Sequence, residues 1–407
     1  MGELVNARTA AERLGVDVRT LYAYVSRGAL RRVPGPDGRS SRYDSDELDL
    51  LARRSRPRTL PRPAASIDLV IATRVSTVTD GMVRYRGTDV LDLVTAGTPF
   101  ERVADLLWQA ATPGSDPGWR FPDAGERPGL PIPDEIPVLH RFAIAVAATA
   151  ADVAAAGVTG GTCTPDWPHC GQRVIGRLID VGGSQSRNRD RADHALRVDR
   201  VDHADHPDDG ATIARRLWQR WSPLPPTAAR VRALDIALVL LAEHELALST
   251  LSVRVAASAR ATPASCLLAG LSTLSGSLHG GAARIVHDKL AAGEPVVTGF
   301  GHPVHRHGDP RVTPLLEAVN VVATDEDRSL IETARRNAPR PLNVDFALGA
   351  LTFAARMPAE AATAIFAIAR VAGWIAHAAE EYEEPPLRFR GRAVRPARGG
   401  LRSPSGG

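Results

Sequence analysis

One stretch of this chain restricts its possible folds more than any other: Gly299-Phe300-Gly301-His302-Pro303-Val304-His305-Arg306-His307-Gly308-Asp309-Pro310-Arg311. It brings histidine, arginine, aspartate and glycine together near the ends of helix-like segments. Histidine can transfer protons near neutral pH, arginine holds carboxylates through paired hydrogen bonds, and glycine permits close approach of the backbone. A single histidine among glycines is more often a structural residue, so the stretch gains its meaning from the segments around it.

Four other segments share this composition and also lie where helical patterns end. They are Glu243-His244-Glu245-Leu246-Ala247-Leu248-Ser249-Thr250, Gly276-Ser277-Leu278-His279-Gly280-Gly281-Ala282, Pro341-Leu342-Asn343-Val344-Asp345-Phe346, and the helix around Ile365-Phe366-Ala367-Ile368-Ala369-Arg370. Each is weak alone, since glycine-rich runs also mark turns. Together they suit a substrate with several carboxylates and abstraction of a proton next to a carbonyl. Neither a Ser/His/Asp nucleophile elbow nor a Walker phosphate loop occurs.

Length and composition place the chain among ordinary globular proteins. It has 407 residues, 44% hydrophobic and 24% charged, which predicts two or three domains and excludes wholesale disorder. Three cysteines are too few for a disulfide framework and favour a reducing compartment. The N-terminus lacks the basic and apolar regions of a signal peptide, and the most apolar stretch, residues 142–158, is alanine-dominated and broken by Asp152. We therefore expect a cytoplasmic protein without a membrane partner.

The formal net charge of +4 is unevenly distributed. Residues 1–62 hold thirteen arginines and eight carboxylates, and residues 388–407 hold six arginines and no carboxylate, which leaves residues 63–387 at −7. Lys289 is the only lysine of the chain. Two basic ends on a mildly acidic body indicate an element that faces a polyanion at one or both ends.

Apolar spacing predicts a mainly helical body after residue 65. The expected helices cover Phe100–Ala111, His140–Ala156, Ala228–Glu243, Ala264–Thr273 and Ala359–Glu380, and a short strand is expected over Ile67–Ala72. Residues 112–135 and 183–210 are expected to be loops, the second a polar insertion. No metal site is predicted, because Cys163, His169 and Cys170 lack a usual zinc spacing and fit a loop, and His194, His203 and His206 fit a solvated loop.

The first 54 residues predict a small domain of their own. Two short helices, over residues 6–14 and 18–27, precede a hairpin over Leu30–Tyr43 and a third helix over 45–54 that Asp44 caps. Either Asn6 or Thr9 is expected to cap the first helix. This order is that of a winged helix-turn-helix. Residues 55–65, within the Arg/Pro-rich stretch 52–65, form a linker.

The headpiece resembles the DNA-binding domains of the MerR/excisionase group, through TAAERLGVDVRTLYAYVSRG (residues 9–28) and the basic wing with Arg42-Tyr43. The resemblance implies that the second helix enters the major groove and that the wing touches the backbone. The residues nominated for DNA are Arg19, Thr20, Tyr22, Tyr24 and Arg27 on the helix, with Arg31, Arg32, Arg39 and Arg42 for phosphates. A headpiece of this kind could instead bind another protein or act as a lid.

The five body segments, taken in order, resemble the citrate synthase family. Its motifs run H-E-x-x-x-S-T, P-L-H-G-G-A, G-[FY]-G-H-x-V-x-x-x-x-D-P-R, P-N-V-D-F and I-F-A-x-A-R-x-x-G-W-I-A-H, and GMVRYRG (residues 81–87) matches an earlier part. The resemblance spans roughly residues 66–400. It implies a mainly α fold with a large helical domain (66–280 and 359–407), a small domain (281–358), an active site in the cleft between them, and a homodimer.

The resemblance also implies roles for individual residues. Asp345 would take a proton from the acyl-CoA α-carbon, His279 would hydrogen-bond the thioester oxygen, and His302 would polarise the oxaloacetate carbonyl. The start of a helix just after His279 would favour its neutral imidazole. The oxaloacetate carboxylates would be held by His244, Arg311 and Arg370, and by Arg390 in the neighbouring subunit's site. CoA would lie against Val296, Gly299, Gly301 and Arg306. No cofactor is implied besides acetyl-CoA, which is a substrate.

The chain departs from the family pattern at several positions without losing the three chemical residues. Pro303 and His305 stand where bacterial members commonly have arginine and tyrosine, and Gly391 stands where proline is usual. Three functions stay open: synthesis of citrate from acetyl-CoA, synthesis of 2-methylcitrate from propionyl-CoA, and metabolite sensing by a DNA-binding regulator. The two donors differ by one methyl group, worth only ~1–3 kcal/mol in a pocket.

Overall fold

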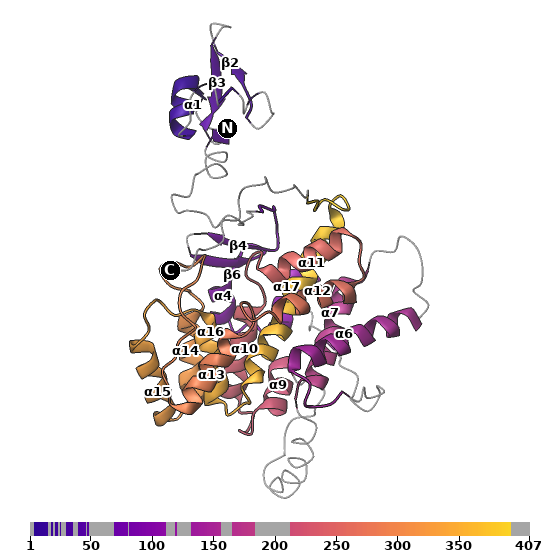
Figure 1. Ribbon diagram of the computed structural model, residues 1–407, viewed down its shortest axis with the longest axis vertical. Coiled ribbons are helices and arrows are strands. Elements are labelled where there is room, and N and C mark those ends of the chain that lie inside the picture. The colour runs from indigo at the N-terminus through magenta and orange to yellow at the C-terminus, as the bar shows by residue number, and fades with distance from the viewer. Residues whose placement is uncertain are drawn as a thin grey trace, which may run out of the picture. The chain divides into compact units, whose positions relative to one another are not determined.

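A computed structural model describes most of the body and parts of the headpiece (Figure 1). The described residues are 4–14, 18, 21–22, 25, 30–35, 40–45, 47–48, 69–79, 81–110, 119, 132–155, 165–183 and 212–391. The chain divides into two compact units, Met1–Ile71 and Ala72–Gly407.

The N-terminal unit is built around a small antiparallel sheet. Its strands are β1 (Leu4–Asn6), β2 (Val33–Pro34) and β3 (Ser41–Asp44), in the order β1-β3-β2. Helix α1 (Ala7–Leu14) follows β1 directly, because the Asn6 side chain accepts the N–H groups of Arg8 and Thr9 as a helix cap does. A small core lies beneath, made of Ala10, Ala11, Leu21, Leu30, Tyr43 and Leu48.

The described part of this unit contains the flanks of the expected hairpin. Val33 pairs with Arg42 and Pro34 with Ser41, and Asp44 Oδ1 accepts the N–H of Glu47 at 3.3 Å, as expected of a helix cap. Strand β1 was not predicted. Most of residues 18–27 and the hairpin tip at 36–39 lie outside the described residues, so the winged helix-turn-helix stays a prediction.

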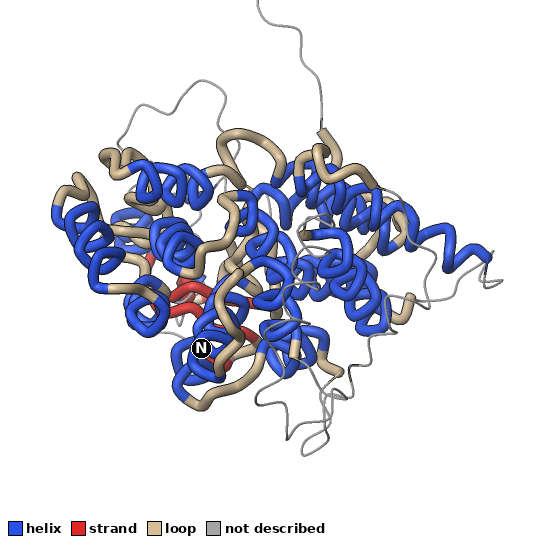
Figure 2. Tube along the Cα trace, turned by 90° about the horizontal axis from the view of Figure 1, so that it is seen from below, coloured by secondary structure: helices blue, strands red, loops and turns tan. Residues whose placement is uncertain are grey.

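The second unit is mainly helical, which confirms the predicted fold class (Figure 2). It begins with the antiparallel strands β4 (Ser76–Thr79), β5 (Met82–Tyr85) and β6 (Thr88–Asp89), which were not predicted. The helices that follow are α4 (Val90–Thr95), α5 (Phe100–Trp108), α6 (Val138–Ala155), α7 (Trp167–Gly182), α9 (Ile213–Trp221), α10 (Ala228–Leu241), α11 (Leu248–Ser258), α12 (Pro263–Leu274), α13 (Ala282–Ala292), α14 (Val312–Val322), α15 (Asp325–Arg336), α16 (Val344–Ala354) and α17 (Glu360–Glu383).

Short polar side chains set where many of these helices begin. Each accepts a backbone N–H of the first turn, which would otherwise lack a partner; they are Asp89, Asp166, Thr212, Thr227, Thr262, Thr324 and Asn343. At the other end of α5, Gln109 adopts a left-handed conformation with φ of 57°. That residue ends the helix at Trp108, three residues before the predicted end.

Helix α17 is the centre of the core. It packs against α5, α6, α7, α10, α11, α12, α13 and α16, and Figure 1 shows it in yellow beside α11 and α12. By length and composition alone α17 could cross a membrane, but 89% of its apolar window is buried inside the protein. Its apolar character is therefore explained by its place in the core.

Two predictions about local structure were wrong. Residues 69–72 form no strand, and the expected loop around His169 and Cys170 is the first turn of α7. Asp166 starts this helix by accepting the N–H of His169, and a proline occupies its first turn, where its missing N–H is harmless. The other predicted loops, 112–135 and 183–210, lie mostly outside the described residues, as do His194, His203 and His206.

Candidate active site

Main-chain hydrogen bonds connect the histidine-rich loop, residues 299–311, to the segment that leads into α16. Gly301 N–H donates to Pro341 O at 2.7 Å, and Asn343 N–H donates to Gly299 O at 2.9 Å. The Asn343 amide adds a bond to Gly301 O at 2.9 Å. Gly299 has φ of +86°, and a Cβ there would lie 2.9 Å from Phe346 Cβ, so glycine is required by both conformation and space.

Asp345 lies in the first turn of α16, beside this loop. Asn343 Oδ1 accepts its N–H at 3.1 Å, which caps the helix and fixes the backbone of the carboxylate. Burial raises the pKa of Asp345 to about 6, against the opposing attraction of Arg311 and Arg370. At neutral pH such a carboxylate is ionised yet more basic than an ordinary aspartate, which suits a general base.

A buried ion pair lies at the C-terminal end of the loop. Arg311 Nε and Nη2 donate to the two oxygens of Asp309 at 2.9 and 2.8 Å, and both side chains are buried. Asp309 Oδ2 also accepts the N–H of Val344 at 3.1 Å, which ties the pair to α16. Burial alone would raise the pKa of Asp309, but Arg311 holds it below the ordinary value. Asp309 therefore both orients Arg311 and joins two segments.

The backbone of the loop fixes the proton of His302. The N–H groups of Val304 and His305 point at His302 Nδ1, at 3.1 and 3.4 Å. A ring nitrogen that accepts hydrogen bonds carries no proton, so the neutral ring keeps its hydrogen on Nε2. Burial, followed by the charge of Arg311, lowers the pKa of His302 to about 4. His302 is thus a neutral Nε2–H donor.

Three imidazoles meet in this site. The ring centroids of His244, His302 and His305 lie 4.9–5.0 Å apart, and the Nε2 atoms of His244 and His305 are 2.8 Å apart. Burial lowers the pKa of both, and Arg311 and Arg370 lower that of His244 further. The cluster therefore consists of neutral rings packed beside two cations.

Arg370 is the cation that links His244, His279 and Asp345. It lies on α17, 2% exposed, with Nε donating to Leu241 O at 2.9 Å and its guanidinium 4.7 Å from the Phe366 ring centroid. Burial lowers its pKa. Its charge lowers the pKa of His244, His279 and Asp345.

His279 is held by the first turn of α11. Ser249 Oγ lies 2.9 Å from His279 Nε2, and the Ser249 N–H donates to the same nitrogen at 3.4 Å. Burial and then Arg370 lower the pKa of His279. The first turn of α11 therefore contacts this ring. The sequence had instead predicted that the helix that follows His279, which is α13, acts on it.

Tyr85 fixes the main chain of Glu243, the residue directly before His244. The Tyr85 hydroxyl lies 2.9 Å from Glu243 O and accepts the Glu243 N–H at 3.2 Å, and burial raises the pKa of Tyr85 to about 12. A Cβ at Gly373 would lie 1.9 Å from Glu243 Oε2, so only glycine leaves room on α17 for this carboxylate.

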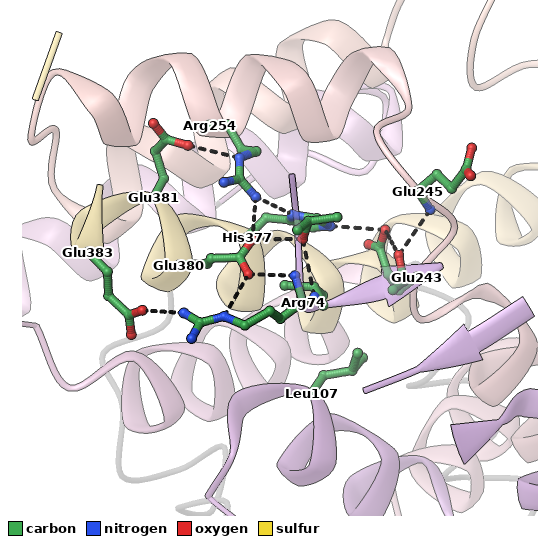
Figure 3. Close-up of polar contacts among 12 residues, drawn as sticks. Arg74, Leu107, Glu243, Glu245, Arg254, His377, Glu380, Glu381 and Glu383 are labelled. Atoms are coloured by element: carbon green, nitrogen blue, oxygen red, sulfur yellow. Dashed lines mark hydrogen bonds and ion pairs between the residues drawn. The ribbon is translucent and has the colours of Figure 1, made fainter. Parts of the chain in front are cut away.

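A buried polar network continues from Glu243 along α17 (Figure 3). Glu243 Oε1 lies 3.1 Å from His377 Nε2, and His377 Nδ1 lies 2.9 Å from Arg254 Nη1. Arg254 then donates to Glu380 at 2.7 Å and to Glu381 at 2.8 Å. Although burial alone would raise it, the pKa of Glu380 is held at about 2 by Arg254, together with hydrogen bonds from segment 73–74.

The structure brings most of the expected residues together. His302 and Arg311 lie on the loop, His244, Arg370 and Asp345 interact with them, and His279 interacts electrostatically with Arg370. Val296 is half-buried and Gly301 lies on the loop, whereas Arg306 and Arg390 are exposed, and among the described residues Arg390 makes no contact with the cluster.

The nominated DNA-binding residues lie mostly outside the described part of the chain. Arg19, Thr20, Tyr24, Arg27 and Arg39 are in this group. Among the others, Tyr22 is 52% exposed, Arg31 and Arg32 are exposed, and Arg42 Nη1 donates to Leu4 O at 3.3 Å. Within the described ranges there is no group of three or more His, Cys, Asp or Glu side chains suited to a metal ion.

Sequence reasoning assigned no role to six supporting residues: Tyr85, Glu243, Ser249, His305, Asp309 and Asn343. All six lie inside the motifs quoted above. Each was visible as a letter of a motif, but at least one of its partners lies thirty or more residues away in sequence. Asp309 of the D-P-R run was the most accessible signal, since a carboxylate two residues before an arginine can pair with it.

Comparisons with known proteins agree on one family. The family model described as "Citrate synthase, C-terminal domain" matches residues 68–290 and 282–397. The chain is 29% identical to 2-methylcitrate synthase 2 of Corynebacterium glutamicum over 359 residues, which cover 79% of this chain and 90% of that protein. It is 26% identical to citrate synthase 2 of Bacillus subtilis over 350 residues, covering 78% and 92%.

Solved structures show the same fold. Citrate synthase from Thermotoga maritima superposes with a TM-score of 0.61 at 20% identity, covering 82% of this chain and 95% of that one. Citrate synthase from Thermoplasma acidophilum, solved with carboxymethyl coenzyme A and oxaloacetate, gives a TM-score of 0.52 at 24% identity, covering 81% and 94%.

Removal of the Asp309 carboxylate should test the buried ion pair. We expect Asp309→Ala to lower the free energy of unfolding by about 3–5 kcal/mol, because Arg311 would stay buried without its partner. Urea unfolding measures this difference. As a control, Asp325→Ala removes the 98% exposed partner of Arg328 and should cost less than about 1 kcal/mol. Equal losses in the two variants would contradict the importance of burial at Asp309.

Proposed function

Because the chain belongs to the citrate synthase family, we propose that it is an enzyme that condenses acetyl-CoA with oxaloacetate to give citrate and CoA. The observation that carries this proposal is the placement of Asp345 and His302 around one loop, with the buried cations Arg311 and Arg370 beside them. A base of raised pKa, a neutral hydrogen-bond donor and two guanidinium groups are what carbon–carbon bond formation between a thioester and a keto-dicarboxylate needs.

In the first step Asp345 would take a proton from the α-carbon of the acyl group. His279 would stabilise the resulting enolate. Since its Nε2 accepts the Ser249 N–H, the ring hydrogen lies on Nδ1, which can donate to the thioester oxygen. A neutral donor matches an enol-like oxygen, and the lowered pKa of His279 keeps the ring neutral.

In the second step the enolate carbon would attack the oxaloacetate carbonyl. His302 would donate its Nε2 hydrogen to that oxygen as negative charge develops. Arg311, Arg370 and His244 would hold the carboxylates and keep the two carbons aligned. Hydrolysis of the thioester by water then releases CoA and makes the reaction irreversible in practice.

Propionyl-CoA is the alternative donor, giving 2-methylcitrate. The similarity to 2-methylcitrate synthase 2 supports propionyl-CoA as a second candidate substrate, in addition to acetyl-CoA. The comparisons lend no support to the alternative of a pure metabolite-sensing regulator, since family and relatives are enzymes.

We further propose the finer organisation that the family resemblance implies. Helices α13 to α16 fall within the proposed small domain, residues 281–358, and the remainder from 66 to 280 and from 359 to 407 would form the large domain. CoA would lie over Val296, Gly299, Gly301 and Arg306, where a positive charge is available for phosphates. No further cofactor is proposed, and the protein is proposed to be cytoplasmic.

A homodimer is also proposed, which sedimentation equilibrium would measure directly. Leu278, beside His279, is fully exposed, and Leu248 at the start of α11 is 64% exposed. Apolar side chains next to a catalytic loop are often covered by a second subunit. In such a dimer the exposed Arg390 would serve the neighbouring site.

The headpiece, with the linker at residues 55–65, is proposed to be a winged helix-turn-helix that binds DNA. The net charge of +5 over residues 1–62, which includes the linker arginines, and the exposed Tyr22 support this role.

The condensation is tested by release of thiol from acetyl-CoA and from propionyl-CoA in the presence of oxaloacetate. We expect activity with at least one donor and a loss of about 10²–10⁴-fold in kcat for Asp345→Asn, which keeps the shape of the side chain but cannot accept the proton. Release from neither donor by the intact chain would overturn the enzyme proposal.

The pH profile should report the Asp345 carboxyl. Only the ionised carboxylate can take a proton, and its pKa is raised to about 6, so kcat/KM for the acyl-CoA should fall about tenfold per pH unit below that value and be level above it. His302, with a pKa of about 4, stays neutral in this range. A profile that stays level down to about pH 5 would contradict the assignment.

DNA binding by the headpiece should depend on salt and on the first 62 residues. We expect a basic headpiece to give binding that weakens as salt rises, and a truncated chain beginning near residue 63 to lose it. Fluorescence anisotropy of labelled duplex DNA measures both. Tyr22→Ala in the full chain tests the exposed helix face without removing the unit. Equal binding by full and truncated chains would count against the proposal.

A further inference from the structure

We infer that His305 is a positioning residue, which donates a hydrogen bond from its Nε2 to Nε2 of His244 and thereby keeps the His244 hydrogen on Nδ1, where it can bind a substrate carboxylate. This inference rests on the proposed function for the identity of the substrate. It concerns a residue that stands where bacterial members of the family commonly have tyrosine.

The contact between the two rings demands one donor and one acceptor. Their Nε2 atoms are 2.8 Å apart, a hydrogen-bond distance, and both rings are buried, with 7% of His244 and 3% of His305 exposed. Two protonated rings would place cations together beside Arg311 and Arg370, which burial and those charges oppose. Each ring thus has a single hydrogen, and the question is which nitrogen carries it.

The other nitrogen of His305 decides the direction. His305 Nδ1 is buried and has no hydrogen-bond partner within the described residues. If the ring hydrogen were on Nδ1, the contact would leave a buried N–H without an acceptor. With the hydrogen on Nε2, the only proton of the ring is used in the contact, and the buried nitrogen that lacks a partner is an acceptor, which costs less than an unpaired N–H. His305 is therefore the donor.

This direction gives His244 the tautomer that a carboxylate needs. A neutral histidine that accepts at Nε2 carries its hydrogen on Nδ1. Among the described residues His244 Nδ1 has no partner, so that hydrogen is available to a ligand. With the opposite tautomer His244 would present a lone pair, which repels a carboxylate. The tautomer of His244 therefore contributes directly to binding of an anionic substrate.

His305 acts on both neighbouring histidines at once. Its main-chain N–H points at His302 Nδ1 at 3.4 Å, which helps to place the His302 hydrogen on Nε2, and its ring donates to His244. One residue thus sets the protonated nitrogen of His244 and, together with the N–H of Val304, contributes to that of His302. Substitution of the ring should alter His244 alone, because the main-chain N–H remains.

The experiment compares His305→Phe with His305→Gln in the full chain. Phenylalanine keeps a flat ring but removes the donor, whereas glutamine keeps an N–H donor near the position of Nε2. ¹⁵N NMR of histidine-labelled protein without substrate reports the tautomer of His244, identified by its loss in His244→Gln. Steady-state kinetics with oxaloacetate gives KM and kcat separately. His307→Phe, at an exposed position of the same loop, is the matched control.

We expect His244 to be the Nδ1–H tautomer in the intact protein and in His305→Gln, and to lose that preference in His305→Phe. The KM for oxaloacetate should rise about 10- to 100-fold in His305→Phe, as expected for loss of a hydrogen bond to a charged group, with a smaller effect on kcat. His305→Gln should stay within about threefold of the intact protein, and His307→Phe should match it.

An Nε2–H tautomer of His244 in the intact protein would overturn the inference, as would an unchanged KM in a folded His305→Phe variant. If His305→Phe does not fold, the tautomer of the intact protein and the kinetics of His305→Gln still decide. Absence of thiol release from the intact chain would instead refute the proposed function, and calorimetric titration with oxaloacetate would then replace the KM comparison.

Discussion

The buried pair of Asp309 and Arg311 is the interaction on which the arrangement of the site depends. Two carboxylate oxygens bind the guanidinium through two hydrogen bonds, and they also hold the N–H of Arg311 and of Val344. A cation inside a protein is costly unless it is paired and hydrogen-bonded. By meeting that requirement with one aspartate, the fold places a permanent positive charge among three histidines and beside the start of α16.

Burial, together with that charge and Arg370, sets the protonation of the groups around them. Burial alone lowers the pKa of histidines and raises that of aspartate, and the cations lower both. The two effects add for His302, whose pKa is about 4, and oppose each other for Asp345, whose pKa is about 6. Neutral donors and an ionised, moderately basic carboxylate therefore coexist at neutral pH.

The sequence predicted the helical class, which the structure confirms, because it depends on local patterns. Apolar spacing predicted the long helices, and motif order nominated His279, His302 and Asp345, whose roles stay a proposal. It failed where a feature depends on contacts between distant segments. The short strands β4–β6 have little apolar alternation, and the ring that holds Nε2 of His244 is sixty-one residues away in sequence. Likewise, His169 and Cys170 were predicted to lie in a loop, although Asp166 and a proline in the first turn signal the helix start that the structure shows there.

Helix α17 explains how such a polar site can lie in an apolar core. Arg370, Gly373, His377 and Glu380 recur at intervals of three or four residues and so form one stripe of the helix. The first binds the end of α10, the glycine admits the Glu243 carboxylate, and the last two continue the polar chain to Arg254. The remaining faces are apolar and fill the core. A single helix thus carries Arg370 and the network that holds the His244 segment, so packing of α17 and geometry of the site cannot change independently.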